Sequence, residues 1–335
     1  MSEYRSNIDL PQAAQLFAKA NHVTVTTHAK PDGDAFGAVV ALTKGMHGLG
    51  KKVDAWFMPP VPRNLKSLNG SELVRHFETD AVLSKTDLVV LLDTGAASQV
   101  TPMLEQLRPL TQQTLIIDHH SSGDLPVKWR YIDGQAAACC EIVADLIAQL
   151  DIKLDDPIIC DALFAGLAAD TGWFRFSNTR AHTHDIAACL LRAGVDHALI
   201  HARLHQNEKI EKLALMSRAL NSLELLQEAH IALMLLRADD FRESNTDISD
   251  TEQFVDIPQM VASVQVVVLL TEPPPSPDES QPPIRVSFRS KPGPNALNMA
   301  KLAARFGGGG HARAAGAKVP GTLDEVASKI RRELT

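Results

Sequence analysis

Short apolar runs that end in an acid or a histidine recur in the first half of the sequence. They are VTVTT (23–27) before His28, DLVVLL (87–92) before Asp93, and TLII (114–117) before Asp118. Brief uninterrupted apolar runs are typical of strands in a parallel sheet that is covered on both faces. The stretch between the first run and the strand VDAWFM (53–58) has the apolar spacing of a helix. We therefore predict an α/β domain with a mainly parallel sheet flanked by helices.

The distribution of apolar, polar, glycine and proline residues along the sequence predicts two domains joined by a helix. Apolar residues at helical spacing continue to about residue 195, and residues 196–227 form a polar stretch without Gly or Pro. Beyond it we expect strands, a Pro-rich hairpin insert at 271–283, a Gly-rich turn and a closing helix at 323–334. The predicted organisation is a first domain over 1–195, a helical linker over 196–227, and a smaller C-terminal α/β domain over 228–335.

Composition and charge exclude several classes of protein. With 335 residues, 45% of them hydrophobic and 22% charged, the chain is too apolar to be disordered. The N-terminus lacks a signal-peptide pattern and no apolar run approaches the length of a membrane span, so we expect a cytoplasmic protein without a membrane partner. The four cysteines lack C-x-x-C spacing and are expected to be buried thiols. A net charge of −7 argues against a long duplex as partner.

Acids and histidines gather where the predicted strands and one helix end. The set is His28, Asp32, Asp34, Asp93, Asp118, His119, His120 and Asp170. A single acid in such a place is usually a helix cap or a solvated turn, and Asp34 is expected to cap the helix that follows it. Four separate segments with the same ending are better explained by convergence, because open parallel sheets bind ligands beyond the carboxyl ends of their strands.

Clustered carboxylates point to bound metal. They repel one another unless a cation neutralises them or their pKa values rise strongly. Imidazole and carboxylate donors without thiolate suit Mn²⁺, with Mg²⁺, Co²⁺ or Fe²⁺ as alternatives. Two such ions, about 3.5–4 Å apart and sharing a carboxylate, would activate a water and stabilise both oxygens of a phosphoryl displacement. The chemistry indicated is phosphoester hydrolysis.

The ordered motifs HAKPDGDAFG, LLDTG, IIDHH, AADTG and GGGGHARAAG resemble those of the DHH phosphoesterases with a C-terminal DHHA1 domain. The likeness is to the nanoRNase and pAp-phosphatase branch and extends over about 18–319. It implies a catalytic, metal-binding DHH domain, a substrate-binding DHHA1 domain and two Mn²⁺ ions. The implied ligands are His28, Asp32 and Asp93 for one ion, and Asp34, Asp93, His119 and Asp170 for the other, with Asp93 as the bridge.

The resemblance also implies roles for residues near the metals and in the second domain. Asp118 would orient neighbouring ligands, and His120 would face the substrate phosphate and protonate the leaving oxygen. Together with Asp93 they form the predicted catalytic set. The nucleotide end of the substrate would be held by Arg289, Ser290, Gly308, Gly309, Gly310 and His311, because an Arg fork and close backbone amides suit phosphate. The chain departs from the pattern at Asp256, where an Asn is expected, and in the long Pro-rich insert.

Several other residues have plainer interpretations. His201 and His205 lie four apart in the predicted linker without the acid of a metalloprotease motif, so we expect solvated helix surface. His182 and His184 are expected at a helix start or on the surface. Phe174 is expected either in the core or stacked on a base, and it is kept among the candidate substrate-binding residues.

Three functions remain open at this level. The leading hypothesis is a metal-dependent phosphodiesterase that degrades very short oligonucleotides, including dinucleotides such as pApA, with a 3′-phosphatase activity on pAp. The alternatives are hydrolysis of inorganic polyphosphate or pyrophosphate, and nucleotide binding without turnover. Polyphosphate sites crowd basic side chains, whereas apolar residues and glycines accompany Arg289 here, which favours a nucleoside-bearing ligand. The resemblance leaves a homodimer open, and the hydrophobic pattern does not decide it.

Overall fold

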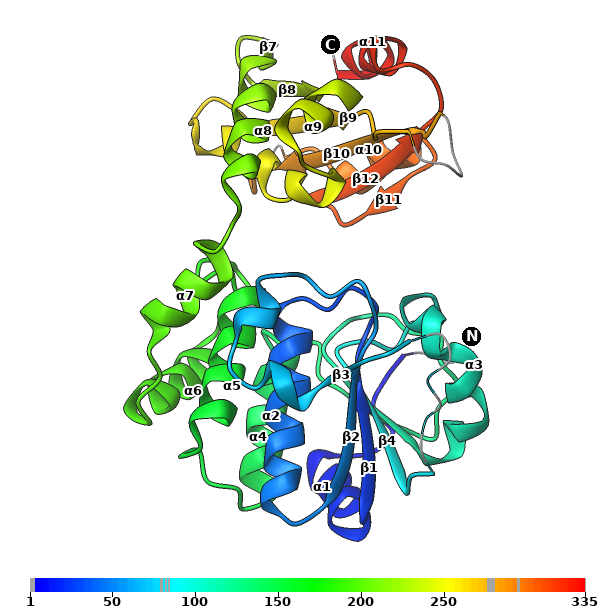
Figure 1. Ribbon diagram of the computed structural model, residues 1–335, viewed down its shortest axis with the longest axis vertical. Coiled ribbons are helices and arrows are strands. Elements are labelled where there is room, and N and C mark those ends of the chain that lie inside the picture. Colours follow the sequence, from blue (N-terminus) through cyan, green and yellow to red (C-terminus); the bar gives the residue numbers. More distant parts are fainter. Residues whose placement is uncertain are drawn as a thin grey trace. The chain divides into compact units, whose positions relative to one another are not determined.

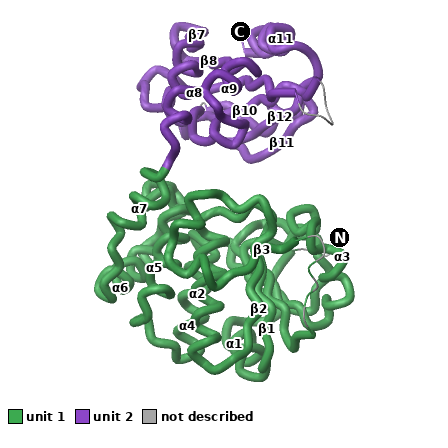
Figure 2. Tube along the Cα trace, viewed as in Figure 1, with its two compact units in different colours: residues 1–207 green, residues 208–335 purple. Residues whose placement is uncertain are grey.

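The chain folds into two compact units. The structure is a computed structural model that describes residues 4–78, 81, 83, 85–275, 281–293 and 296–334 (Figure 1). The units comprise Met1–Asn207 and Glu208–Thr335 (Figure 2). Each is organised around a six-stranded sheet of its own and is described here separately. The predicted combination of two α/β units is therefore confirmed.

The sheet of the first unit is parallel throughout, in the order β3-β2-β1-β4-β5-β6. Its strands are β1 (His22–Thr26), β2 (Lys52–Phe57), β3 (Arg75–His76), β4 (Leu88–Leu92), β5 (Thr114–Asp118) and β6 (Trp129–Ile132). The chain first moves outward from β1 to β3 and then returns to continue from β4 to β6. Between β1 and β4 the order reverses, and such a switch point is where open parallel sheets bind ligands.

Helices cover both faces of this sheet, as the apolar strand runs predicted. The helices are α1 (Leu10–Lys19), α2 (Gly33–Gly48), α3 (Leu104–Leu107), α4 (Cys139–Gln149), α5 (Pro157–Asp170), α6 (Ala181–Arg192) and α7 (His197–His205). Side chains of α1, α2, α4 and α5 form one core against the sheet, and residues 97–113, which include α3, contribute to a second core on the other face. Figure 1 shows the strands between α2 and α4 on one side and α3 on the other.

Glycines allow α2, α4 and α5 to pack very closely. A Cβ on Gly37 of α2 would collide with the backbone oxygen of Ala162 and the sulfur of Cys140, and a Cβ on Gly166 of α5 would collide with that same sulfur. Asp34 lies one turn before Gly37, and Asp170 lies one turn after Gly166. The close approach of the helices therefore brings two acids of the predicted site together.

The second unit has a mixed sheet in the order β11-β12-β10-β9-β8-β7, in which β8 and β9 are parallel and the other pairs antiparallel. Two cores lie on its opposite faces, one with α10 and α11 and the other with α8 and α9. The strands are β7 (Glu224–Leu226), β8 (Ile231–Leu236), β9 (Val266–Thr271), β10 (Ile284–Ser290), β11 (Gly309–Gly310) and β12 (Ala314–Val319). The helices are α8 (Ile210–Asn221), α9 (Ala238–Ser244), α10 (Met299–Ala304) and α11 (Leu323–Leu334).

The stretch expected as one linker helix over 196–227 contains several elements. It comprises α7, the non-helical residues 206–209, α8 and the strand β7. Leu215 and Ala219 of α8 are buried in a core of the second unit, whereas Ile200 and Leu204 of α7 are buried in a core of the first. The polar segment between the helices has no apolar side chain to add to either core, and the division between the units falls within it.

Three smaller expectations have mixed outcomes. The Pro-rich insert does join two antiparallel strands, β9 and β10, although its residues 276–280 lie outside the described residues. Cys139, Cys140 and Cys160 are buried as expected, but Cys189 is exposed, because it lies on the outer side of α6. None of the helices in the described part of the chain combines the length and the apolarity of a membrane span.

Candidate metal and catalytic site

The predicted acids and histidines of the first unit meet at the carboxyl ends of its central strands. His28 follows β1, Asp93 directly follows β4, and Asp118 is the last residue of β5. Asp170 reaches the same place as the last residue of α5. Because β1 and β4 are the strands on either side of the reversal in strand order, the site lies at the topological switch point of the sheet.

Asp93 lies at the centre of this cluster. Its side chain is 2% exposed, and its backbone has a left-handed conformation with φ of +61°. Oδ2 lies 3.4 Å from Nε2 of His28, and Oδ1 lies 3.3 Å from Nε2 of His119. Oδ1 is fully buried without a hydrogen-bond partner among the described residues. A buried carboxylate oxygen without a partner is costly, and a bound cation would satisfy it.

Three groups of candidate ligands include or adjoin Asp93. In each group, ligand atoms of all three side chains lie within 4.8 Å of one another. Two of the groups contain the six predicted ligands, namely His28, Asp32 and Asp93, and Asp34, His119 and Asp170; the third joins Asp93 and His119 to His120. Their donors are imidazole nitrogens and carboxylate oxygens, the set that suits a divalent ion of the Mn²⁺ type. The structure thus brings together all six residues predicted as ligands, and the residues present fit a metal centre.

Electrostatic strain within the cluster supports the same conclusion. Burial, together with the charges of Asp93 and Asp170, raises the pKa of Asp34 well above its usual range. Burial also raises the pKa of Asp170, to about 6. Burial lowers the pKa of His28, but bonding and attraction to Asp93 outweigh it and raise that pKa to about 9. For His119, Asp93 and Asp34 likewise outweigh burial and raise the pKa to about 10. Without cations, protons must balance this charge.

Asp34 does not cap the helix in which it lies. Asp32 is the N-cap of α2, and its Oδ1 accepts hydrogen bonds from the backbone nitrogens of Asp34 and Ala35, each at 3.0 Å. The expected cap at Asp34 was therefore wrong by two residues. Asp34 instead accepts hydrogen bonds from the first two amides of α4, at Cys139 and Cys140. It thus serves as the side-chain acceptor for the start of another helix.

Asp118 organises the histidines that follow it. It is fully buried, and its Oδ1 accepts bonds from the backbone nitrogens of His119 (2.8 Å) and His120 (3.1 Å) and from Nδ1 of His120 (2.7 Å). Because a carboxylate can only accept, Nδ1 of His120 carries a proton there. This bond to Asp118 raises the pKa of His120. The half-exposed ring is thereby held with its other nitrogen available.

A residue that the sequence did not bring to notice completes this arrangement. The hydroxyl of Tyr4 donates a 2.6 Å hydrogen bond to Oδ2 of Asp118. No local motif marks Tyr4, and 114 residues separate it from its partner. The sequence therefore held no signal that could have identified it.

The turn after Asp170 carries aromatic side chains that pack within the first unit. Phe174, predicted as a substrate-binding residue, stacks on His184 and meets Phe164 edge to face, with ring centroids 5.4 Å and 5.8 Å away. The indole nitrogen of Trp173 donates to Nε2 of His205 at 2.7 Å. His205 was expected as plain solvated surface, and that expectation missed a contact across 32 residues of sequence.

In the second unit, the predicted nucleotide-binding residues lie on and beside β10 and β12. Arg289 is 36% exposed, and its Nε lies 4.0 Å from Oδ1 of Asp256. Ser290 is buried and its hydroxyl donates to the backbone oxygen of Leu297 at 2.9 Å, so its side chain holds a loop. His311 is exposed at the turn between β11 and β12. Substrate contact by these residues remains a prediction.

The glycine-rich turn has a structural requirement of its own. A Cβ on Gly308 would collide with the backbone oxygen of Gly316, and a Cβ on Gly310 would meet the backbone of β12 at Ala314 and Ala315. Gly309 has open space around it. An open cavity of about 430 Å³ beside this turn is lined by Arg285, Val286, Ser287, Gly307, Gly308, Gly316, Ala317 and Lys318. Close packing explains two of the predicted binding glycines, while Gly309 stays available.

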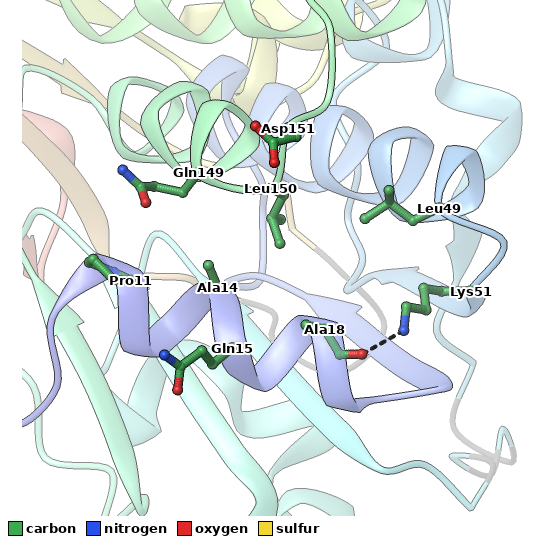
Figure 3. A pocket seen from close by; sticks show the side chains of 9 residues that line it. All are labelled: Pro11, Ala14, Gln15, Ala18, Leu49, Lys51, Gln149, Leu150 and Asp151. Carbon is green, nitrogen blue, oxygen red and sulfur yellow. Dashed lines mark hydrogen bonds between the residues drawn. The ribbon is translucent and has the colours of Figure 1, made fainter.

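Another open cavity lies in the first unit, away from the predicted site. It measures about 470 Å³, is wide open, and lies between α1 and the C-terminal ends of α2 and α4. Figure 3 shows mainly aliphatic side chains around it, with Lys51 donating to the backbone oxygen of Ala18. None of its lining residues belongs to the predicted site. This cavity therefore gives no information about the chemistry of the predicted site.

Comparison with known proteins agrees with this geometry. A model of the N-terminal domain of the DHH family matches residues 22–168, and a model of the DHHA1 domain matches residues 230–335. A relative from Thermus thermophilus, the bifunctional oligoribonuclease and PAP phosphatase NrnA, is 30% identical over 328 residues, which cover 96% of this chain and 93% of that protein.

Solved structures share the fold. An exopolyphosphatase-related protein from Bacteroides fragilis matches with a TM-score of 0.86 at 22% identity, covering 96% of this chain and 94% of that one. RecJ from Thermus thermophilus, solved in complex with Mn²⁺, matches with a TM-score of 0.55 at 17% identity, covering 97% of this chain and 54% of that one. The chain belongs to the DHH family of metal-dependent phosphoesterases, with an N-terminal DHH domain joined to a C-terminal DHHA1 domain.

Proposed function

We propose that this protein hydrolyses short oligonucleotides, with dinucleotides such as pApA as the smallest substrates, and removes the 3′-phosphate of pAp. Two divalent cations, Mn²⁺ by preference, serve as cofactors. The observation that carries the proposal is the buried Oδ1 of Asp93, which has no hydrogen-bond partner among the described residues and lies between two groups of His and Asp donors. The relative from Thermus thermophilus, named for oligoribonuclease and PAP phosphatase activities, supports the choice of substrate.

In this proposal the six clustered side chains hold the cations. His28, Asp32 and Asp93 would hold one ion, and Asp34, His119 and Asp170, together with Asp93, would hold the other. The cations supply an activated water at neutral pH and offset the charge that develops on the phosphoryl oxygens. Asp93 fixes both groups relative to each other, because its two oxygens face His28 and His119 from opposite ends of one carboxylate.

The chain's own residues complete the reaction. His120, held by Asp118 through Nδ1, presents Nε2 to the leaving oxygen and gives up its proton there. Asp118 fixes the tautomer and orientation of that imidazole through its hydrogen bond to Nδ1. The ring of His120 is half-exposed and is therefore accessible to substrate. Its bond to the buried carboxylate of Asp118 fixes its orientation.

The second unit provides recognition of the nucleotide. Arg289 offers a guanidinium fork to a phosphate, and Gly309 and His311 offer exposed backbone and imidazole donors at the adjacent turn. The net charge of −7 gives the chain no general attraction for a long polymer. These features together favour a small substrate with few phosphates.

One release assay tests the proposal against its alternatives. The full chain is incubated with pApA, pAp, a 20-nucleotide RNA, inorganic polyphosphate and pyrophosphate, with Mn²⁺ or with a chelator, and products are separated chromatographically. We expect mononucleotides from pApA and phosphate from pAp only with Mn²⁺, and Asp93→Asn as the inactive control. Faster release from polyphosphate or pyrophosphate would overturn the substrate class, and nucleotide binding without any release would overturn catalysis.

A further inference from the structure

A continuous hydrogen-bonded chain runs from Tyr4 to the histidine that faces substrate. Tyr4 donates to Oδ2 of Asp118, whose Oδ1 accepts from Nδ1 of His120. We infer that Tyr4 is a positioning residue for the phosphoester reaction and fixes the carboxyl group of Asp118 so that His120 points its free nitrogen at the leaving oxygen. The inference rests on the proposed function for the role of His120 and adds a residue outside the matched family domain, which begins at residue 22.

The fold contains a slot built for this tyrosine. A Cβ on Gly95 would collide with the hydroxyl and ring of Tyr4, and a Cβ on Gly123 would collide with that same ring and with the backbone oxygen of Gly95. Gly95 follows Asp93 by two residues, and Gly123 follows His120 by three. Neither glycine has a positive φ. The backbone conformation therefore does not require glycine at positions 95 and 123, whereas the space taken by the Tyr4 ring does.

The chain after Tyr4 is anchored along β6, the edge strand of the sheet. Asn7 pairs with Arg130 through its backbone nitrogen (2.9 Å) and accepts from the backbone nitrogen of Arg130 through its side chain (2.7 Å). The hydroxyl of Ser6 both accepts from the backbone nitrogen of Ile132 and donates to its oxygen. These bonds imitate a strand ladder and lead the chain to the carboxyl ends of the strands, where Tyr4 enters its slot.

Tyr4 provides the hydrogen bond to one of the two carboxylate oxygens of Asp118. The carboxyl group is fully buried, Oδ1 takes all three bonds from residues 119 and 120, and Oδ2 takes the bond from Tyr4 as its sole donor among the described residues. Burial and the neighbouring carboxylate raise the pKa of Tyr4, so the phenol keeps its proton. Without that donor, the carboxylate would hold a buried oxygen unsatisfied, and only the bonds to Oδ1 would restrain its rotation about Cβ–Cγ.

The inferred step moves one proton from His120 and leaves the phenol unchanged. As the P–O bond to the leaving nucleoside breaks and the bond from water to phosphorus forms, Nε2–H of His120 gives its proton to the leaving oxygen, and the attacking water releases a proton to solvent. His120 becomes neutral and keeps Nδ1–H in its bond to Asp118. Tyr4 keeps its own proton on the other carboxylate oxygen throughout. The benefit of correct positioning is therefore greatest when the leaving oxygen needs a proton.

The choice of leaving group separates this role from a merely structural one. A nucleoside alkoxide must be protonated, whereas p-nitrophenolate departs as a stable anion. Tyr4→Phe keeps the ring in its slot and removes only the donor. We expect kcat for pApA to fall roughly 10-fold in this variant, with kcat for bis(p-nitrophenyl) phosphate within about 2-fold of wild type. The affinity for Mn²⁺, measured by titration without substrate, should be unchanged.

The chain offers a matched control, because it contains two tyrosines. Tyr131→Phe removes a hydroxyl from β6 and should affect neither substrate. In the background of His120→Ala, adding Tyr4→Phe should lower turnover of pApA no further, because residues acting in one chain are not additive. Equal losses on both substrates, an additive loss, or a loss of Mn²⁺ affinity would each overturn the inference.

A readout without turnover tests the contact itself. Protein labelled with 3-fluorotyrosine gives two ¹⁹F resonances, and Tyr131→Phe identifies the one from Tyr4. In metal-free protein, Asp118→Asn should shift the Tyr4 resonance, and an unmoved resonance would contradict the inferred contact. Wild-type protein inactive on pApA would overturn the proposed function instead. The leaving-group comparison would then use phenyl and p-nitrophenyl phosphodiesters, which report on Tyr4 independently of nucleotide recognition.

Discussion

The Oδ2 atom of Asp34 lies 2.5 Å from the backbone nitrogen of Cys139, although 105 residues separate them in sequence. Its Oδ1 accepts from the next amide, Cys140, at 2.8 Å. Asp34 thus satisfies two amides at the start of α4 while its carboxylate also faces His119 and Asp170. One side chain joins the assembly of the helices to the assembly of the metal centre.

Because of this double role, we expect the replacement of Asp34 to destabilise the fold more than the replacement of any other predicted ligand. Asp34→Ala leaves two buried amides without an acceptor, so we expect the free energy of unfolding of metal-free protein to fall by about 2–3 kcal/mol. Urea denaturation in a chelator measures it. Asp170→Ala is the matched control, because burial raises the pKa of this carboxyl group too, but no backbone amide among the described residues donates a hydrogen bond to its side chain, so its loss should cost little without metal. Equal stability of the two variants would contradict the capping role.

In contrast to replacement of Asp34, replacement of Asp93 should affect metal binding and turnover rather than folding. Asp93→Asn keeps the shape of the side chain but removes the charge that both candidate ion sites share, so we expect loss of high-affinity Mn²⁺ binding and turnover reduced at least about 10³-fold. Isothermal titration with Mn²⁺ and the pApA assay measure the two effects. Near-wild-type hydrolysis would remove Asp93 from the site.

Much of the site could be predicted because its signals are local. The runs before Asp93 and Asp118 are apolar without interruption, which marks buried parallel strands, and an acid directly after such a run lies at a sheet edge where ligands bind. The parallel order of the sheet then places His28 beside Asp93 with no further assumption. The helices α5 and α11 could be located from apolar spacing for the same reason.

The parts that sequence could not predict depend on contacts between distant residues. Whether Asp34 or Asp32 caps α2 is decided by the amides of α4, which attract Asp34 away from its own helix. Tyr4 gains its importance from slots at Gly95 and Gly123 that exist only after the sheet has formed. The interruption at 206–209 reflects packing of α7 and α8 into separate cores, which spacing within one polar stretch does not reveal.

Arg289 should contribute to substrate binding and not to metal binding. Arg289→Ala removes a charge-assisted contact worth about 1.5–3 kcal/mol, so kcat/KM for pApA and pAp should fall roughly 10- to 100-fold, mainly through KM. Hydrolysis of p-nitrophenyl phosphoesters and the affinity for Mn²⁺ should be unchanged. Arg242→Ala, on the exposed surface of α9, controls for the loss of one positive charge. Equal damage on both substrates would assign Arg289 a structural role.

Asp256 should weaken the attraction of Arg289 for phosphate. Its carboxylate lies 4.0 Å from the guanidinium, and both side chains are at least one-third exposed, so solvent screens the pair. We expect Asp256→Asn to lower KM for pAp by about 2- to 5-fold at low salt and to lose that effect near 0.5 M salt. Glu252→Gln changes the same charge four residues earlier and should have a smaller effect. A higher KM in Asp256→Asn would show that Asp256 supports substrate binding.

The metal-free protein should lose stability as pH rises. Folding raises the pKa of Asp170 to about 6, that of His28 to about 9 and that of His119 to about 10, so the folded state binds more protons than the unfolded chain. The contribution of the histidines is complete below their unfolded pKa near 6.5 and is lost as pH rises through 9 and 10. We expect the free energy of unfolding in a chelator to fall by on the order of 3 kcal/mol between pH 6 and 8.5.

Saturating Mn²⁺ should abolish this fall, because deprotonated imidazoles bind the ion and the ion replaces the protons that balanced the carboxylates. Urea denaturation at both pH values, with and without Mn²⁺, measures the change, and stability that rises with pH in the chelator would show that these histidines are not protonated in the metal-free cluster.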